Sequence, residues 1–219
     1  MSELPCKTIS VSGSDAFEFL QSQLTNDVTL LETEAEIFAA WCNPKGRVIW
    51  FGTIHANESG YAMSVAADLA EDMVSRLTVF RFRSKVEFAI AEGGTVDPKF
   101  LITNGYPFIG AIQSEHFTPH MLNLDLLGAV SVDKGCYPGQ EIVARTHFRG
   151  ATKRRLLRFE STEPVSPGDK VSDGERDVGE VLNAAGNELL AVVPIDKANQ
   201  GLTVNGNAMV NLPLPYLQE

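Results

Sequence analysis

Alternation of apolar and polar residues opens the chain and predicts a short strand at residues 8–11. Apolar residues then recur every three or four positions through residues 16–24, which is the spacing of one buried helix face. Asp15 precedes this segment and Glu18 follows three positions later, so we expect the two side chains to form a capping box. The first predicted unit is therefore a strand followed by a helix.

The next segment predicts a series of strands. Residues 35–42 form a mostly apolar run, as expected of a buried strand. Residues 43–46 read Asn-Pro-Lys-Gly, with proline at the second position of a turn, and residues 47–55 return as a strand. Another strand is expected at residues 61–66, after a second turn.

A second helix and a further strand follow. Residues 68–80 carry apolar side chains at helical spacing, with acidic residues in the first turn, where the helix dipole favours them. Residues 85–91 alternate like a strand, and we expect Gly93 and Gly94 to mark the junction after it. The order strand, helix, strands, helix, strand resembles a ferredoxin-like α+β arrangement. Residues 97–127 show no clear periodicity.

The pattern changes after Gly150. Brief alternating segments, such as residues 156–160 and 189–193, are separated by turns rich in glycine, asparagine and aspartate. Short strands with dense turns predict a small β-barrel of about 65 residues. We therefore predict an α+β region at residues 1–150 and a C-terminal barrel at residues 151–219.

Composition indicates an ordinary globular chain. Its 219 residues are 44% hydrophobic and 21% charged, which allows a substantial core. The net charge of −10 argues against general binding to nucleic acid or anionic membranes, although a local basic patch can still act. Three dispersed cysteines indicate a reducing compartment, and we recognise neither a signal peptide nor a membrane-spanning apolar run. We therefore expect a cytoplasmic protein without a membrane partner.

Residues 134–141 hold the densest chemistry, and we name them the cysteine turn. They read Lys-Gly-Cys-Tyr-Pro-Gly-Gln-Glu, in which Pro138 suits the first turn of a following helix. Cys136 then stands ahead of a helix N-terminus and two residues from Lys134, and both features stabilise a thiolate. The residues alone equally allow a tight turn with a small buried cysteine.

The helix predicted at residues 140–148 places Ile142 and Val143 on its buried side and leads into a basic run. The run holds a third of the chain's 18 basic residues and no acidic one: Arg145, Arg149, Lys153, Arg154, Arg155 and Arg158. Arginine forks match carboxylates and phosphates, so we expect Arg145 and Arg149 to bind an anion. For Arg158 we favour an ordinary solvated charge on an edge strand.

Several common sites are absent from the sequence, including phosphate loops, dinucleotide-binding glycine motifs, the nucleophile elbow and the zinc-protease motif. His116 and His120 are four positions apart, but Pro119 between them argues against one helix presenting both. We expect two loop histidines with ordinary hydrogen bonds and no metal site. Three dispersed cysteines are also too few to hold an iron–sulfur cluster alone.

The cysteine turn and the helix after it carry a family resemblance. Lys-Gly-Cys-Tyr-x-Gly-Gln-Glu, followed by Ala-Arg-x-His-x-Arg-Gly at residues 144–150, is similar to the signature of the YgfZ-type folate-binding proteins. These proteins are relatives of the glycine-cleavage T-protein, an aminomethyltransferase, and include a mitochondrial iron–sulfur assembly factor. Supporting matches extend over nearly the whole chain, at residues 19–28, 42–47, 80–86 and 117–124.

The resemblance implies a fold, a cofactor and partners. The implied fold is T-protein-like, with α/β domains in a ring around a central folate channel and a C-terminal barrel. The implied role is folate-dependent support of iron–sulfur cluster assembly or repair, notably for tRNA-modifying enzymes. Tetrahydrofolate or a related folate is the expected cofactor, and iron–sulfur client enzymes are the expected partners. Direct contact with tRNA is the less favoured alternative.

The expected site centres on the cysteine turn. The expected catalytic residues are Cys136, as the reactive thiol, and Lys134, as the cation that favours its thiolate. The expected cofactor-binding residues lie beside them and along the following helix: Tyr137, Gln140, Glu141, Arg145 and Arg149. In this interpretation the tyrosine shapes the pocket, the amide and the carboxylate offer hydrogen bonds, and the arginines meet anionic groups such as a folate glutamate tail.

Three departures from the family bear on the chemistry. A segment is missing around residues 92–98, which opens the expected channel. Trp50 and Phe51 stand where T-proteins carry the acidic pair that assists aminomethyl transfer, and neither can act as a general base. Cys6 and Asp97 fall near positions where better-known members hold tryptophans beside folate. An aminomethyltransferase-like one-carbon transferase is therefore the alternative function, and a non-catalytic protein-binding module is the third.

Overall fold

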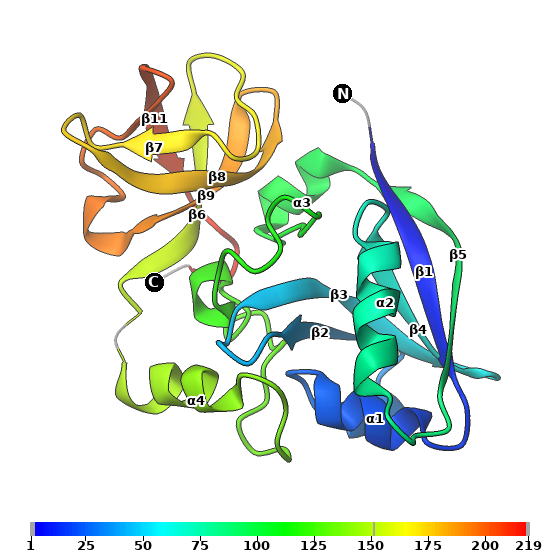
Figure 1. Ribbon diagram of the computed structural model, residues 1–219. Helices are drawn as coiled ribbons and strands as arrows, with labels where there is room; N and C mark the ends of the chain where they lie inside the picture. Colours follow the sequence, from blue (N-terminus) through cyan, green and yellow to red (C-terminus); the bar gives the residue numbers. More distant parts are fainter. Residues whose placement is uncertain (1–2, 151, 218–219) are drawn as a thin grey trace.

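The computed structural model describes residues 3–150 and 152–217. Two parts dominate it, a five-stranded sheet covered by helices and a closed barrel (Figure 1). Ala151, at the expected boundary between the two regions, lies outside the described residues, as does the start of the segment assessed for a signal peptide.

The sheet has the strand order β2-β3-β4-β1-β5, and its neighbouring strands are antiparallel. Its strands are β1 (Leu4–Ser12), β2 (Ile37–Cys42), β3 (Val48–Asn57), β4 (Gly60–Ala66) and β5 (Glu87–Val96). β1 and β3 both pair with β4, so they run parallel to each other with β4 between them, as in a split βαβ unit. The ferredoxin-like arrangement is confirmed, with β2 added at one edge.

Two helices cover one face of this sheet (Figure 1). α1 (Ala16–Gln23) follows β1, and α2 (Ala70–Phe80) connects β4 to β5. Between sheet and helices lies a core in which Leu20, Trp41 and Met73 are fully buried. The two predicted helices are therefore confirmed. The sequence spacing placed Phe17 on the buried face of α1, but Phe19 is the buried phenylalanine there.

The expected capping box at α1 is wrong. Asp15 does precede the helix, but its side chain makes no capping hydrogen bond there. Its Oδ2 instead accepts a hydrogen bond from the backbone N–H of Lys85, at 2.8 Å. This bond lowers the pKa of the Asp15 carboxyl. The carboxylate thus connects the loop between β1 and α1 to the segment before β5. These two segments are far apart in sequence.

The expected junction at Gly93 and Gly94 is also wrong, because both glycines lie inside β5. The pairing of β1 with β5 shifts register between Pro5 and Lys7. At that irregularity a Cβ on Gly93 would come within 2.6 Å of the carbonyl oxygen of Cys6. The glycine therefore marks a close approach of two strands rather than the end of one.

The segment after β5 is short. Asp97 caps α3 (Pro98–Asn104) by accepting a hydrogen bond from the N–H of Lys99, at 2.9 Å. The strand thus leads directly into a helix at the point where the sequence resemblance implied a missing segment. The described residues consequently contain one α/β unit of this kind rather than a ring of them.

Six strands form the predicted barrel, which closes in the order β10-β11-β6-β9-β8-β7. These strands are β6 (Arg154–Ser161), β7 (Lys170–Ser172), β8 (Asp177–Ala185), β9 (Glu188–Pro194), β10 (Thr203–Val204) and β11 (Asn207–Leu212). The remaining helical segments are η1 (Val28–Glu32), η2 (Pro119–Leu122), α4 (Gln140–Arg149) and η3 (Ile195–Lys197). The prediction of a C-terminal barrel is confirmed.

The barrel does not stand apart from the sheet. Its Leu156 and Leu190 share one apolar core with Phe51 of β3 and Leu122 of η2. Asn123, which is fully buried, adds a polar tie by donating from Nδ2 to the carbonyl oxygen of Leu156, at 2.7 Å. Sheet, connecting loops and barrel are therefore packed as one body.

Candidate functional site

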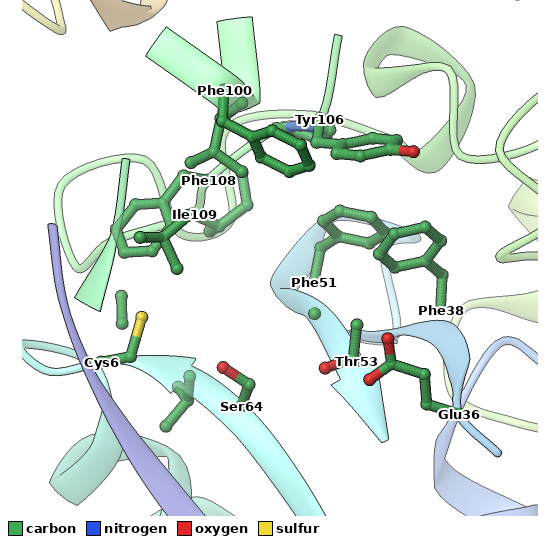
Figure 2. A pocket seen from close by; sticks show the side chains of 16 residues that line it. Cys6, Glu36, Phe38, Phe51, Thr53, Ser64, Phe100, Tyr106, Phe108 and Ile109 are labelled. Carbon is green, nitrogen blue, oxygen red and sulfur yellow. The ribbon is translucent and has the colours of Figure 1, made fainter. Parts of the chain in front are cut away.

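One hollow among the described residues, which we name the aromatic cavity, has a volume of about 460 Å³. Phe38 of β2 and Phe51 of β3 stack at its wall, with ring centroids 5.4 Å apart and ring planes inclined by 29°. Phe100 of α3 and Tyr106 face this pair from the opposite side, as Figure 2 shows. Phe108 closes one end. Such walls suit a flat ring system, because aromatic faces pack well against one another.

Few polar groups reach this cavity. Glu36, which is solvent-exposed, contributes the one carboxylate, and Thr53 and Ser64 contribute hydroxyls on the cavity floor (Figure 2). Cys6 lies at the far end, where burial raises the pKa of its thiol. Neither lysine nor arginine lines the cavity. The hollow therefore favours an uncharged ring with hydrogen-bond donors on one edge.

Trp50 and Phe51 point to opposite faces of β3. The Trp50 indole is fully buried on the helix side, where its Nε1 donates to the carbonyl oxygen of Ser64 at 2.9 Å. The Phe51 ring lines the aromatic cavity. Alternation along the strand explains the difference, because successive side chains face opposite sides of a sheet. Of the two residues expected at the position of the T-protein acidic pair, only Phe51 therefore faces the cavity.

The predicted site residues gather elsewhere. Cys136, Tyr137, Gln140 and Glu141 line a smaller hollow of about 290 Å³, which we name the thiol pocket. Its wall is completed by Pro44, Gly139 and Ile142. Arg145 and Arg149 lie farther along α4, are exposed, and line neither hollow. None of the predicted catalytic or cofactor-binding residues lines the aromatic cavity.

Two glycines let the cysteine turn approach the β2–β3 turn. Gly139, at φ 81°, precedes α4, and a Cβ there would lie 2.5 Å from the carbonyl oxygen of Asn43. Gly46, at φ 68°, would place a Cβ only 2.9 Å from the Cβ of Ile142. Glycine adopts such left-handed conformations without strain and leaves room for the neighbouring backbone. The thiol pocket thus depends on both turns.

The helix after the cysteine turn is confirmed as α4, which begins at Gln140. Pro138 lies two positions before this start rather than in the first helical turn. Val143 is buried as expected, but Ile142 is 37% exposed, so the expectation for Ile142 is wrong. Ile142 instead covers the thiol pocket and Gly46, a contact that helical spacing does not reveal.

Lys134 has an unusual environment, because its ammonium is surrounded by backbone carbonyls. Nζ donates to the carbonyl oxygens of Gln21, Leu24 and Asn26 at 2.6, 2.7 and 2.9 Å, and it lies 5.5 Å from the Tyr137 ring centroid. Burial lowers the pKa of Lys134 to about 8. The charged form still predominates at neutral pH, and three charge-assisted hydrogen bonds hold it.

These contacts fix the cysteine turn to the C-terminal end of α1. Carbonyls at that end carry the negative pole of the helix dipole, which suits a cation. Cys136, two residues away, is exposed to solvent. Among the described residues the ammonium donates to these carbonyls and makes no hydrogen bond to the thiol. Its influence on the acidity of Cys136 stays a prediction.

The basic run of the sequence is dispersed by the fold. Arg155 forms a bidentate ion pair with Asp125, at 2.6 and 2.9 Å, and Arg158 pairs with Glu188 at 2.6 Å. β6, which carries both arginines, pairs with β9 and β11 inside the closed barrel. Arg158 is therefore neither a solvated charge nor a residue of an edge strand, and that expectation is wrong.

The two loop histidines differ from each other. His116 forms the expected ordinary hydrogen bond, because its Nδ1 lies 3.3 Å from Oε1 of Glu180. His120 is only 2% exposed, and neither ring nitrogen has a hydrogen-bond partner, so the expectation fails for this residue. Burial lowers the pKa of His120, which keeps the ring neutral at pH 7. It packs beside His147 of α4, with ring centroids 6.0 Å apart.

Comparison with known proteins shows which proteins the chain is similar to. The family model described as CAF17, C-terminal beta-barrel domain, matches residues 153–216. The tRNA-modifying protein YgfZ of Sodalis glossinidius (strain morsitans) is 25% identical, over 95% of this chain and 90% of the relative. The protein of the same name from Hamiltonella defensa is 27% identical, over 68% of this chain and just under two thirds (66%) of the relative.

A solved structure shares the fold. The crystal structure of glycine cleavage system aminomethyltransferase T from Bartonella henselae superposes with a TM-score of 0.76, at 13% identity. The match covers 97% of this chain and 84% of that one. In sequence the chain is similar to the proteins named tRNA-modifying protein YgfZ, and it has the fold of the glycine-cleavage T-protein. The fold and the relatives thus agree with the resemblance that the cysteine turn indicated.

Further observations concern the positions that the family resemblance singled out and two kinds of site. Cys6 lines the aromatic cavity, close to where the family resemblance expected a folate-flanking side chain, whereas Asp97 serves as the cap of α3. Within residues 3–150 and 152–217, no three His, Cys, Asp or Glu side chains come together as a metal site. In the same part of the chain, no helix is long and apolar enough to cross a membrane.

The ammonium of Lys134 yields the first testable prediction. A Lys134→Met variant should lower the free energy of unfolding by about 2–4 kcal/mol, because buried carbonyls lose a charged donor. Urea unfolding, followed by fluorescence, measures the difference. Lys85→Met is the matched control, since that lysine is exposed and forms no ion pair among the described residues. Equal stabilities for the two variants would show that the carbonyl contacts do not hold the turn.

Accessibility yields a second prediction. Iodoacetamide should modify Cys136 in the folded protein well before Cys42, which is 1% exposed and whose thiol pKa is raised to about 12 by burial. Cys6 should also stay protected until the chain is unfolded. Peptide mass spectrometry after timed quenching measures the order. Comparable rates for Cys136 and Cys42 in the native state would contradict the assignment of an available thiol.

Proposed function

We propose that this protein is a cytoplasmic folate-binding factor that supports iron–sulfur cluster assembly or repair, including that of tRNA-modifying enzymes. The observation that carries the proposal is the aromatic cavity with its single carboxylate, on a T-protein fold. Relatives named tRNA-modifying protein YgfZ support the connection to tRNA modification. The thiol of Cys136 is exposed, which supports a role for this residue as a reactive group or as a cluster ligand.

The aromatic cavity fits the pterin ring of a folate. A pterin is flat, so the stacked Phe38 and Phe51 rings on one side and Tyr106 on the other would hold its faces. The edge of the ring carries an amino group beside a ring N–H, and the Glu36 carboxylate can accept from both. Bound tetrahydrofolate would supply one-carbon carrier chemistry. The protein side chains supply stacking, one acceptor and exclusion of water.

The charge of the lining orients the ligand. Folate's glutamate tail is anionic, and the aromatic cavity holds no lysine or arginine to meet it. The pterin therefore enters first, and the tail remains toward solvent. In this arrangement Arg145 and Arg149, the residues expected to bind the tail, do not contribute to the cavity itself.

Cys136 would act separately from the pterin ring. It is the exposed thiol among three cysteines, whereas Cys6 and Cys42 are buried. One thiolate cannot hold an iron–sulfur cluster alone, because such clusters usually take four protein ligands. It can donate a single sulfur ligand to a cluster that a client enzyme carries. The client, rather than this chain, then supplies the remaining ligands.

The transferase alternative has less support. Aminomethyl transfer in T-proteins uses an acidic pair, and Phe51 occupies the cavity-facing position of that pair here. A phenyl ring neither accepts a proton nor stabilises a developing cation as a carboxylate does. Glu36 is the one carboxylate in the lining, and hydrogen bonding to a pterin edge would occupy it.

Calorimetry with tetrahydrofolate tests the cavity directly. Wild-type protein should bind, and Glu36→Gln should weaken binding about 10- to 100-fold, because a charge-assisted hydrogen bond is lost. Glu34→Gln is the matched control, since Glu34 is exposed two residues away and does not line the cavity. Absence of heat with the wild type, or equal affinity for both variants, would remove the folate assignment.

Complementation tests the thiol. In cells that lack the chromosomal copy, Cys136→Ala and Cys136→Ser should both fail to restore the activity of an iron–sulfur enzyme. Their melting temperatures should match the wild type, because Cys136 is exposed and packs little. Restoration to the wild-type level by either variant would leave the cysteine turn a structural element.

A further inference from the structure

The cations of this acidic chain are unevenly distributed. In the part of the chain that the structure describes, seven lysines and arginines form ion pairs: Lys7, Arg76, Lys99, Arg155, Arg158, Lys170 and Lys197. Four of the others gather around one hollow between the β2–β3 turn and the barrel: Lys45, Arg47, Arg154 and Arg176. We name this hollow the charged cleft. It consists of two adjoining spaces of about 840 and 230 Å³ that share Arg154.

Most acidic groups of the charged cleft are already engaged. Glu115 accepts hydrogen bonds from Asn43 Nδ2 at 2.7 Å and Arg76 Nη1 at 3.0 Å. Glu180 pairs with Lys170 and lies 3.3 Å from Nδ1 of His116. Asp177, which lines both spaces of the cleft, forms no ion pair in the described structure. Positive charge therefore remains in excess inside the cleft, although the whole chain carries a net charge of −10.

The two arginines are held in place without being neutralised. Arg47 donates from Nη1 to the carbonyl oxygen of His116 at 2.7 Å. Arg154 donates from Nη2 to the carbonyl oxygen of Val178 at 2.8 Å. A carbonyl is uncharged, so it fixes the guanidinium without cancelling the positive charge that would attract an anion. Lys45 and Arg176 are exposed, and each adds a positive charge to one of the two spaces.

The chemistry of the lining distinguishes between two kinds of anionic partner. The apolar side chains in the cleft are those of Phe117, Met121, Val178 and Pro194, and the other side chains there are charged or polar. Stable protein partners are usually met by an apolar core with a polar rim. Contacts with nucleic acid are more polar and much more positively charged. The charged cleft matches the second description.

We propose that the charged cleft binds the phosphate backbone of a nucleic-acid strand, with Lys45, Arg47, Arg154 and Arg176 as the phosphate contacts. The net negative charge elsewhere does not prevent this, because distant charges are screened beyond about 10 Å at 0.1 M salt. The net charge of −10 argues against general binding to nucleic acid, and the charged cleft is a local basic surface that departs from this average. The basic run at residues 145–158 contributes only Arg154 to it.

The position of the cleft connects it to the thiol pocket. Lys45 and Arg47 line the charged cleft, while Pro44, in the same β2–β3 turn, lines the pocket of Cys136. A strand in the cleft would therefore pass beside the exposed thiol. This placement is independent of the aromatic cavity, so the folate assignment and the strand assignment can fail separately.

Fluorescence anisotropy with labelled oligouridine and oligothymidine tests the proposal on the intact protein without folate. Binding to at least one of the two should weaken with salt, and comparing them tells RNA from DNA. The variant Lys45→Gln/Arg176→Gln should bind about 10-fold more weakly, with a salt slope smaller by about one to two. Both residues are exposed, so folding should be retained. Arg47→Gln should weaken binding in the same direction.

The control removes the same charge from another surface. Arg83→Gln/Lys85→Gln lies in the exposed segment before β5, outside the charged cleft, and should bind like the wild type. Equal losses for both double variants would reveal general electrostatic attraction and overturn the site. No anisotropy change at low salt would also overturn it. Tighter binding of oligoglutamate than of either oligonucleotide would assign the cleft to an acidic peptide instead.

Discussion

The candidate site depends on the contact between the Lys134 ammonium and the backbone carbonyls at the end of α1. A buried charge without partners is costly, so this lysine is tolerable only because three carbonyls at the end of α1 receive it. The same bonds place the cysteine turn, and with it Cys136, against the first helix of the chain. The sequence motif predicts a catalytic role for Lys134. In the structure its hydrogen bonds hold the cysteine turn in place.

The framework was predictable because periodicity reports which side of an element is buried. The spacing of Leu69, Met73 and Leu77 located α2, and the turn-rich texture after Gly150 located the barrel. What failed was pairing between distant segments. Asp15 is a residue type that often caps helices, yet its side chain accepts a hydrogen bond from the backbone of Lys85. Gly93 is a residue type that often ends a strand, yet here it lies within one and allows the close approach of Cys6 on the neighbouring strand.

The candidate site was predictable only in part, for the same reason. Cys136, Tyr137, Gln140 and Glu141 are neighbours in sequence, so a motif could group them, and the fold does place them around one hollow. The aromatic cavity draws on all five strands of the sheet and on the segment that contained no periodic pattern. No local spacing links its side chains. One available signal was the alternation of β3, which separates Trp50 from Phe51.

The β2–β3 turn has a consequence beyond its own conformation. It is a thin partition, with Pro44 on the side of the thiol pocket and Lys45 and Arg47 on the side of the charged cleft. Gly46 brings it into direct contact with α4. Any occupant that moves this partition alters the neighbouring compartment, and linkage requires the coupling free energy to be equal in both directions. Two compartments divided by one turn cannot be tuned independently.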